Sequence, residues 1–166
     1  VFKFMNMKKI LLLCISLLLT ISMQSQVTKT AAAGVNNWNN ASSWSPSGVP
    51  ASNDNILVPS GAKMKVNVTG VTIDYFTISG GGELEVNNSM SVTGGSASQV
   101  TGSSSTLSLK ENMTINGTST VTVGSGASIT LTSGKQLILS NSSSTLTNNG
   151  TITLNSSSSA FSSLLL

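Results

Sequence analysis

Residues 120–139 read TVTVGSGASITLTSGKQLIL, and their pattern indicates the fold class most clearly. Its apolar residues come in pairs two positions apart, with polar residues between and beside them. The pairs are Val121/Val123, Ile129/Leu131 and Leu137/Leu139. Alternation of period two with one polar face is typical of a half-buried β-strand. Turn formers at 124–126 and 133–134 separate the pairs, so the stretch predicts three short strands joined by tight turns.

The same pattern continues outward in both directions. Further pairs are Ile56/Val58, Met64/Val66, Phe76/Ile78, Leu84/Val86, Met90/Val92, Leu107/Leu109, Met113/Ile115 and Ile152/Leu154, with Leu146 alone where another pair would fall. Val121, Ile129 and Leu137 step by eight, and residues 94–105 read as a longer insertion. Regularly spaced short strands predict a repeat architecture, in which three units of eight form one coil of 24 residues.

A strand of four or five residues with one apolar face cannot bury that face alone. Stacked coils solve this by enclosing one continuous core of inward side chains. We therefore expect an all-β chain folded as a right-handed parallel β-helix that is incomplete at its C-terminus. The alternative is an antiparallel β-sandwich, which also contains short alternating strands but usually has less uniform loops.

The first 25 residues differ from the rest of the chain. Lys8 and Lys9 precede an apolar run at 10–21 and a small polar exit, which together predict a cleaved secretory signal ending at Ser25. An uncleaved anchor is the alternative. Residues 1–6 read as sequence upstream of the true start. We thus expect a signal peptide at 1–25, an opening cap segment at 26–55 and solenoid repeats at 56–166.

Composition excludes several classes of function. Among the 166 residues are 67 Asn, Ser and Thr, no His and one Cys, which lies inside the apolar run. This leaves no Ser-His-Asp or Cys-His nucleophile, and no thiolate or imidazole site for zinc. After residue 25, five Lys balance five Asp and Glu. Without Arg or a basic stripe, nucleic-acid binding has no electrostatic basis.

The opening segment contains both tryptophans, Trp38 and Trp44, and all three prolines fall within residues 34–61. The first coil of a solenoid exposes an apolar end, so terminal repeats act as caps. Two indole rings packed over that end would cover it, and we favour this interpretation. The alternative is that the rings stack on sugars, since aromatic faces also bind apolar sugar faces.

This segment resembles the opening of the eight-glycine domain of large extracellular proteins. It also resembles N-terminal β-helix segments of bacterial surface proteins exported by type IX secretion. The resemblance covers roughly residues 38–93. It rests on Trp44, Pro46, Gly48, Pro50, Asp54, Ile56–Val58, Gly61 and the run FTISGGGEL at 76–84. It implies export, a long multi-domain chain and a C-terminal sorting domain, and it transfers no catalytic residues. The apolar run SSLLL at 162–166 has no polar cap, so we expect a fragment of a longer reading frame.

Glu83 and Glu85 flank Leu84, so both carboxylates are predicted to point outward from one strand. Paired carboxylates can hydrolyse glycosides, but positions i and i+2 lie about 7 Å apart on any strand, which is not diagnostic. Lys63 and Lys65 form a matching pair one strand earlier. The favoured reading is therefore a group of solvated charges with a weak cross-strand ion pair. Asp54 is expected to bind its own turn, and we assign no metal and no cofactor.

Outward threonine pairs recur at Thr120/Thr122 and Thr145/Thr147, which a coil of about 24 residues would align. They form a candidate surface for a ligand. A regular threonine array can also order water, which makes ice binding a minor alternative. Thr130/Thr132 would meet Thr153/Asn155, so only two threonine rungs align.

We therefore expect a non-enzymatic structural or adhesive segment of a secreted or cell-surface protein. Its expected partners are an extracellular polysaccharide or a surface, with no nucleic acid and no stable membrane span. The alternative is the N-terminal part of a polysaccharide-active enzyme whose catalytic residues lie beyond Leu166.

Overall fold

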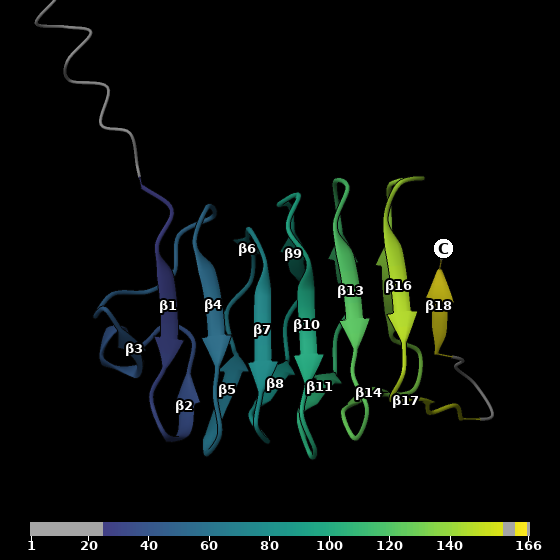
Figure 1. The fold of residues 1–166 in the computed structure, drawn as a ribbon, viewed down its shortest axis with the longest axis horizontal. Coiled ribbons are helices and arrows are strands. Elements are labelled where there is room, and N and C mark those ends of the chain that lie inside the picture. Colours follow the sequence, from purple (N-terminus) through teal and green to yellow (C-terminus); the bar gives the residue numbers. More distant parts are fainter. Residues whose placement is uncertain (1–24, 158–161, 166) are drawn as a thin grey trace, which may run out of the picture.

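The computed structural model describes residues 25–157 and 162–165, whose strands wind into a β-solenoid with three sheets along its length (Figure 1). Sheet A contains β1 (Thr28–Ala31), β3 (Trp44–Ser45), β4 (Asn55–Val58), β7 (Phe76–Ser79), β10 (Ser98–Thr101), β13 (Thr120–Val123) and β16 (Thr145–Asn148). Sheet B contains β2 (Gly34–Asn37), β5 (Ala62–Val66), β8 (Glu83–Val86), β11 (Thr106–Leu109), β14 (Ser128–Leu131) and β17 (Thr151–Leu154). Sheet C contains β6 (Val71–Ile73), β9 (Met90–Val92), β12 (Met113–Ile115), β15 (Gln136–Leu139) and β18 (Ser163–Leu165).

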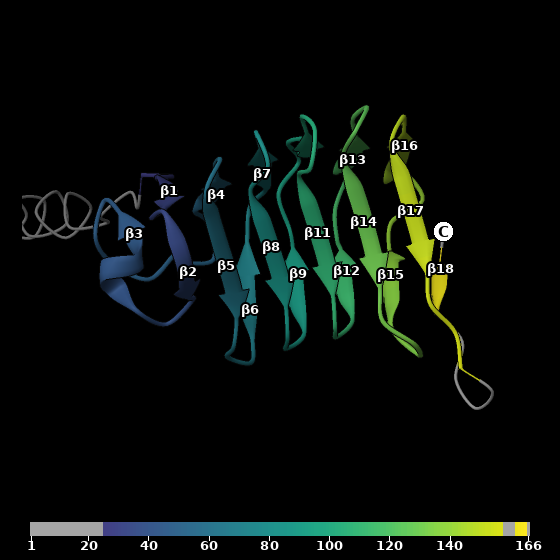
Figure 2. The same cartoon turned by 90° about the horizontal axis from the view of Figure 1, so that it is seen from below.

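The strands of successive coils pair in parallel and in register, which confirms the solenoid over the antiparallel sandwich. Figure 2 shows sheet B from outside, with one strand per coil from β2 to β17. The coils are less uniform than the predicted 24 residues. Met64 pairs with Leu84, 20 positions later, whereas Val121 pairs with Leu146, 25 positions later. The difference lies in the corners, because the strands that stack in parallel all have three to five residues.

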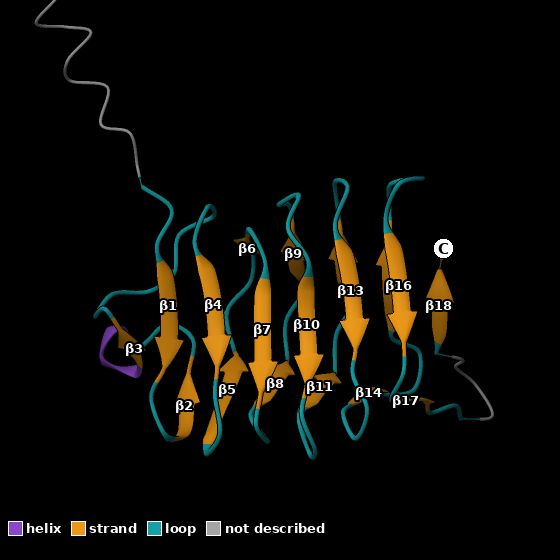
Figure 3. Cartoon of the chain, in the orientation of Figure 1, coloured by secondary structure: helices purple, strands orange, loops and turns teal. Residues whose placement is uncertain are grey.

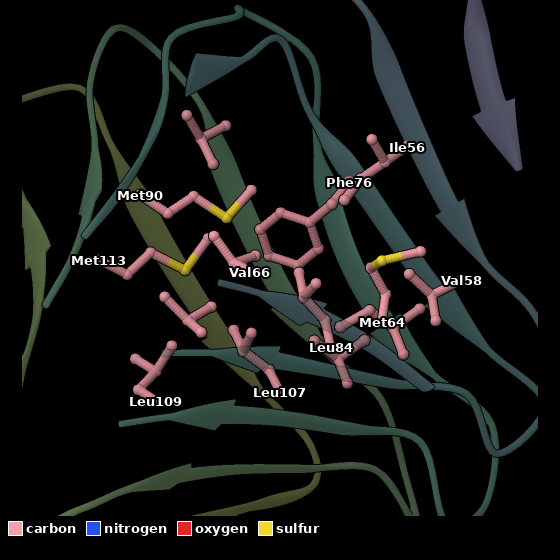
Figure 4. Close-up of a cluster of buried hydrophobic side chains, with 14 of the residues drawn as sticks. Ile56, Val58, Met64, Val66, Phe76, Leu84, Met90, Leu107, Leu109 and Met113 are labelled. Atoms are coloured by element: carbon pink, nitrogen blue, oxygen red, sulfur yellow. The ribbon is translucent and has the colours of Figure 1, made fainter. Parts of the chain in front are cut away.

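The core is a stack of inward side chains, one layer per coil (Figure 4). Ten of the predicted apolar pairs, from Ile56/Val58 to Leu137/Leu139, are buried. In sheet C, Met90 pairs with Met113, and Figure 4 shows both side chains in the buried core together with Phe76. Each coil thus completes the apolar layer that its neighbours need, as the alternation predicts.

Strands β10 and β6 lie within the repeats but were not predicted from the sequence. The stretch 94–105, interpreted as an insertion, contains β10, which pairs with β7 and β13 in sheet A. The alternation does not indicate β10, because one of its two inward positions is the polar Ser98 and only Val100 is apolar. Ser98 is fully buried, and its hydroxyl accepts the N–H of Phe76 at 3.3 Å. The second missed strand is β6, whose buried pair Val71/Ile73 lies close before Phe76.

The corners bring backbone against backbone. At Gly82, a Cβ atom would lie 2.2 Å from the carbonyl oxygen of Val58 in the preceding coil, so only glycine fits. Ser105 is fully buried at the same corner, one coil further along. Its hydroxyl donates to the Thr101 carbonyl at 2.6 Å and accepts the Gly81 N–H at 3.0 Å. Small corner residues thus let successive coils approach and also satisfy turn backbone groups.

The two ends of the solenoid differ. At one end β3 pairs antiparallel with β1, next to the short helix η1 (Ala41–Ser43), which is drawn purple in Figure 3. At the other end β16, β17 and β18 are the last strands of their sheets. There the predicted pair Ile152/Leu154 is only partly covered, and Leu154 is 46% exposed.

The predicted signal at 1–25 and its apolar run at 10–21 fall almost wholly outside the described residues. Within residues 25–157 and 162–165, no helix is long and apolar enough to span a bilayer. Residues 26–55, predicted as a cap segment, contribute the strands β1, β2 and β3.

Candidate functional surfaces

A charged cluster lies on the outer face of sheet B, where the alternation of β5, β8 and β11 turns polar side chains outward. Lys63 pairs in register with Glu83, and Lys65 with Glu85. The ammonium of Lys63 binds both carboxylates, at 2.8 Å from Glu83 Oε1 and 2.8 Å from Glu85 Oε2. Lys110, just after β11, reaches Glu85 Oε1 at 3.1 Å. The predicted cross-strand ion pair is therefore present as a network.

Glu85 departs from the expected solvated charge, because only 7% of its side chain is exposed. Burial by itself raises the pKa of a carboxyl and so opposes the charge. Hydrogen bonds from Lys63, Asn87 and Lys110 stabilise the carboxylate, and together they lower the pKa of Glu85 to about 2. The hydrogen bond from Asn87 Nδ2 measures 2.9 Å.

The same hydrogen bonds act on the lysine. Those to Glu83 and then Glu85 raise the pKa of Lys63 above its ordinary value. A general acid in glycoside hydrolysis needs a raised carboxyl pKa, and Glu85 shows the opposite shift. The ion pairs of Lys63, Glu83, Glu85 and Lys110 therefore link three adjacent coils through buried and half-buried charges.

A block of hydroxyls follows on the same face of sheet B and was missed at the sequence level. Three strands present outward pairs in register, namely Thr106/Ser108 on β11, Ser128/Thr130 on β14 and Thr151/Thr153 on β17. The hydroxyls of Thr106 and Ser128 lie 3.3 Å apart. Serine fills two of the six positions, so only β17 carries a Thr-x-Thr pair and the threonine pattern alone does not reveal the block. We call these six residues the hydroxyl block.

The threonines predicted as a ligand surface lie on sheet A. Thr120 pairs with Thr145 and Thr122 with Thr147, and the Oγ1 atoms of Thr120 and Thr145 are 3.0 Å apart. On the preceding coil, the register partner of Thr122 is Gln99, so the row of threonines ends there. The two rungs thus align as expected, but the threonine array extends no further along sheet A.

Trp38 and Trp44 pack against each other at the end of the solenoid near β3. Their ring centroids are 5.0 Å apart at an interplanar angle of 75°, and the indole N–H of Trp44 donates to the Trp38 carbonyl at 2.9 Å. The two residues are 2% and 3% exposed. Protein atoms therefore cover both rings, and neither offers an open face to a sugar.

The remaining acidic residues have local partners. Asp54 Oδ2 accepts the N–H of Ala51 at 2.8 Å, the turn contact expected from the sequence. Glu111 binds Lys135 on the next coil at 2.5 Å. Across the described ranges 25–157 and 162–165, no three potential metal ligands of the His, Cys, Asp or Glu type gather in one place.

The family comparison matches residues 43–163 to the G8 domain. The matched range is 121 of the 166 residues and extends from η1 to β18. The sequence resemblance covered only the first part of this range. No curated protein and no solved structure gives a match.

Proposed function

The chain belongs to the G8 domain family, and on this premise we propose that it is a non-enzymatic structural and adhesive segment of a secreted or surface-displayed protein. G8 domains occur in extracellular proteins. Residues 1–25 would direct export and be removed in the process. The resemblance of the opening segment to bacterial surface proteins makes type IX secretion part of the proposal.

The observation that supports adhesion best is the hydroxyl block of sheet B. Its six side chains lie on three parallel strands, about 4.8 Å apart between strands and about 7 Å apart along each strand. Hydroxyls both donate and accept hydrogen bonds, so a flat array of them can match the hydroxyls of a polysaccharide. The threonines 120, 122, 145 and 147 on sheet A form a second, smaller surface of the same chemistry.

The charged cluster supports the structural part of the proposal. Glu83 and Glu85, whose spacing alone would also allow a pair of catalytic carboxylates, both bind Lys63. Such a network links coils and leaves the outer face close to neutral. A neutral polar surface suits contact with uncharged polysaccharide better than with nucleic acid.

Binding to immobilised neutral polysaccharides tests the proposal, with residues 26–166 as the probe. Thr130→Val with Thr153→Val removes two hydroxyls of the block while keeping side-chain shape and strand propensity. Thr122→Val with Thr147→Val is the matched variant on sheet A. Loss of retention in one double variant would identify the binding face.

Two results would contradict the proposal. One is the absence of retention on every polysaccharide tested, together with wild-type attachment by cells that lack the gene. The other is release of reducing sugar by residues 26–166, which would make the segment itself an enzyme. Activity of a longer protein but not of this segment would favour the alternative of an enzyme whose catalytic residues lie beyond Leu166.

A further inference from the structure

The hydroxyl block runs along the axis of the solenoid in two columns. They exist because β11, β14 and β17 stack in register, side by side on the outer face of sheet B (Figure 2). Each column advances by one strand spacing per coil, about 4.8 Å, and the two columns lie about 7 Å apart. The first column is Thr106, Ser128 and Thr151, and the second is Ser108, Thr130 and Thr153.

Each strand of the block offers a ligand only two outward positions. On β11 these are Thr106 and Ser108, because Leu107 and Leu109 are turned into the core. A ligand laid along one strand therefore meets two hydroxyls before it reaches a corner of the solenoid. A ligand laid along the axis meets one hydroxyl of each column in every coil. The arrangement thus favours a long ligand that runs parallel to the axis.

The chemistry of the block favours hydrogen bonding over stacking and over charge. Residues 77–160 contain no aromatic residue, so this part of the chain has no ring to stack on a sugar face. The strands β11, β14 and β17 also contain no charged residue. On β8 the two columns continue as Glu83 and Glu85, and both of these carboxylates bind Lys63. An uncharged ligand with hydroxyls along both edges therefore suits this surface.

The linkage of a polysaccharide decides whether its hydroxyls can follow the columns. Pyranose units joined through equatorial bonds, as in a β-1,4-linked glucan, form an extended ribbon in which the length of one unit is close to one strand spacing. An axial bond, as in an α-1,4-linked glucan, bends the chain into a helix. Only the extended chain places successive sugars over successive coils.

We propose that the hydroxyl block binds an extended, neutral polysaccharide chain that lies along the solenoid axis with one sugar unit over each coil. The inference rests on the proposed adhesive function and specifies its ligand class and its binding orientation. The two columns contact the hydroxyls at the two edges of the ribbon. The strands β11, β14 and β17 each hold one sugar.

Isothermal titration of residues 26–166 with oligosaccharides of increasing length tests this proposal. With β-1,4-linked gluco-oligosaccharides, we expect the association constant to rise about fivefold when the third unit is added and to change little with further units. The α-1,4-linked gluco-oligosaccharides of the same lengths are expected to bind about tenfold more weakly. This comparison uses the parent chain and needs no variant.

Thr151→Val with Thr153→Val removes both hydroxyls of β17 while keeping side-chain shape and strand propensity. Two rungs of hydroxyls then remain, so the association constant should level off at two sugar units in place of three. Thr122→Val with Thr147→Val on sheet A is the matched control, and its length dependence should equal that of the parent. Circular dichroism shows whether both variants retain the β-solenoid.

The outcomes separate this proposal from the adhesive function on which it rests. Equal affinity for α-linked and β-linked chains overturns the proposed ligand class, whereas adhesion to polysaccharide stands. So does a folded β17 variant whose affinity still levels off at three units, which overturns the orientation along the axis. A changed length dependence in the sheet A variant alone would place the binding face on sheet A and also overturn the proposal. Absence of binding to every polysaccharide would contradict both the proposal and the adhesive function.

Discussion

Lys65 and Glu85 are register partners on β5 and β8, yet the Glu85 carboxylate is held by Lys63, its diagonal neighbour, at 2.8 Å. The diagonal contact lets one ammonium serve two carboxylates, because Lys63 also binds its own register partner. Glu85 is left with little solvent and three hydrogen-bonding partners.

This relationship predicts a pH dependence of stability. Since the pKa of Glu85 is lowered from 4.5 to about 2, folding favours the carboxylate. The stabilisation is complete above about pH 5 and is lost as the pH falls towards 2. Its size is on the order of 3 kcal/mol, and it can be measured by denaturant unfolding across this range. In the Glu85→Gln variant, we expect the free energy of unfolding to change less between pH 5 and pH 2.

Glu111→Gln serves as the control for this measurement. It removes another lysine-bound carboxylate, but one whose side chain is 34% exposed. This variant should keep most of the pH dependence of the parent chain. Equal pH slopes for the parent and Glu85→Gln would show that Glu85 does not stabilise the fold as described.

Gly82→Ala is expected to destabilise the corner between β7 and β8. The added Cβ would lie 2.2 Å from the Val58 carbonyl oxygen, a backbone atom that cannot rotate away. We expect a loss of about 3 kcal/mol or more in the free energy of unfolding, measured by chemical denaturation. Gly95→Ala is the control, because its Cβ would meet only the Thr118 hydroxyl at 3.4 Å. Similar losses in both variants would contradict the close approach at Gly82.

Trp44→Phe is expected to weaken the capped end. It removes the indole N–H that donates to the Trp38 carbonyl at 2.9 Å and leaves that buried oxygen without its donor. The expected cost is about 2 kcal/mol, seen as a lower midpoint in denaturant. Val49→Ala, at a 43% exposed apolar residue of the same segment, should change the midpoint little. An unchanged midpoint for Trp44→Phe would argue against the hydrogen bond.

Ser43→Ala is expected to stabilise the chain. The Ser43 hydroxyl is buried beside Trp44 and has no hydrogen-bond partner among the described residues. Alanine removes the cost of burying a hydroxyl without a hydrogen bond. We therefore expect the free energy of unfolding to rise by about 1 kcal/mol, with a higher Tm in a thermal melt. Ser42→Ala removes an exposed hydroxyl that donates to Asn40 at 2.9 Å and should bring no gain. A lower Tm for Ser43→Ala would contradict the assignment.

The sequence predicted the solenoid because inward positions are apolar in most coils, as Met64, Leu84 and Leu107 illustrate on sheet B. It missed β10 because inward Ser98 is polar and is satisfied by a backbone N–H, which no alternation rule registers. The hydroxyl block escaped for a related reason. Serine and threonine both present a hydroxyl on an outer face, so a pattern of threonine alone does not reveal the block. The burial of Glu85 could not be predicted, since it depends on how Lys63 and Lys110 from two other coils cover it.

The parallel stacking of coils also determines how the molecule would respond to force. Each coil uses 19 to 28 residues yet adds only one strand spacing, about 4.8 Å, to the length of the solenoid. The same residues drawn out straight would span roughly 60 to 100 Å. Tension along the axis acts on the hydrogen bonds of one terminal coil at a time. A tether built in this way would lengthen stepwise, unwinding coil by coil, while the coils still stacked keep their outer faces intact.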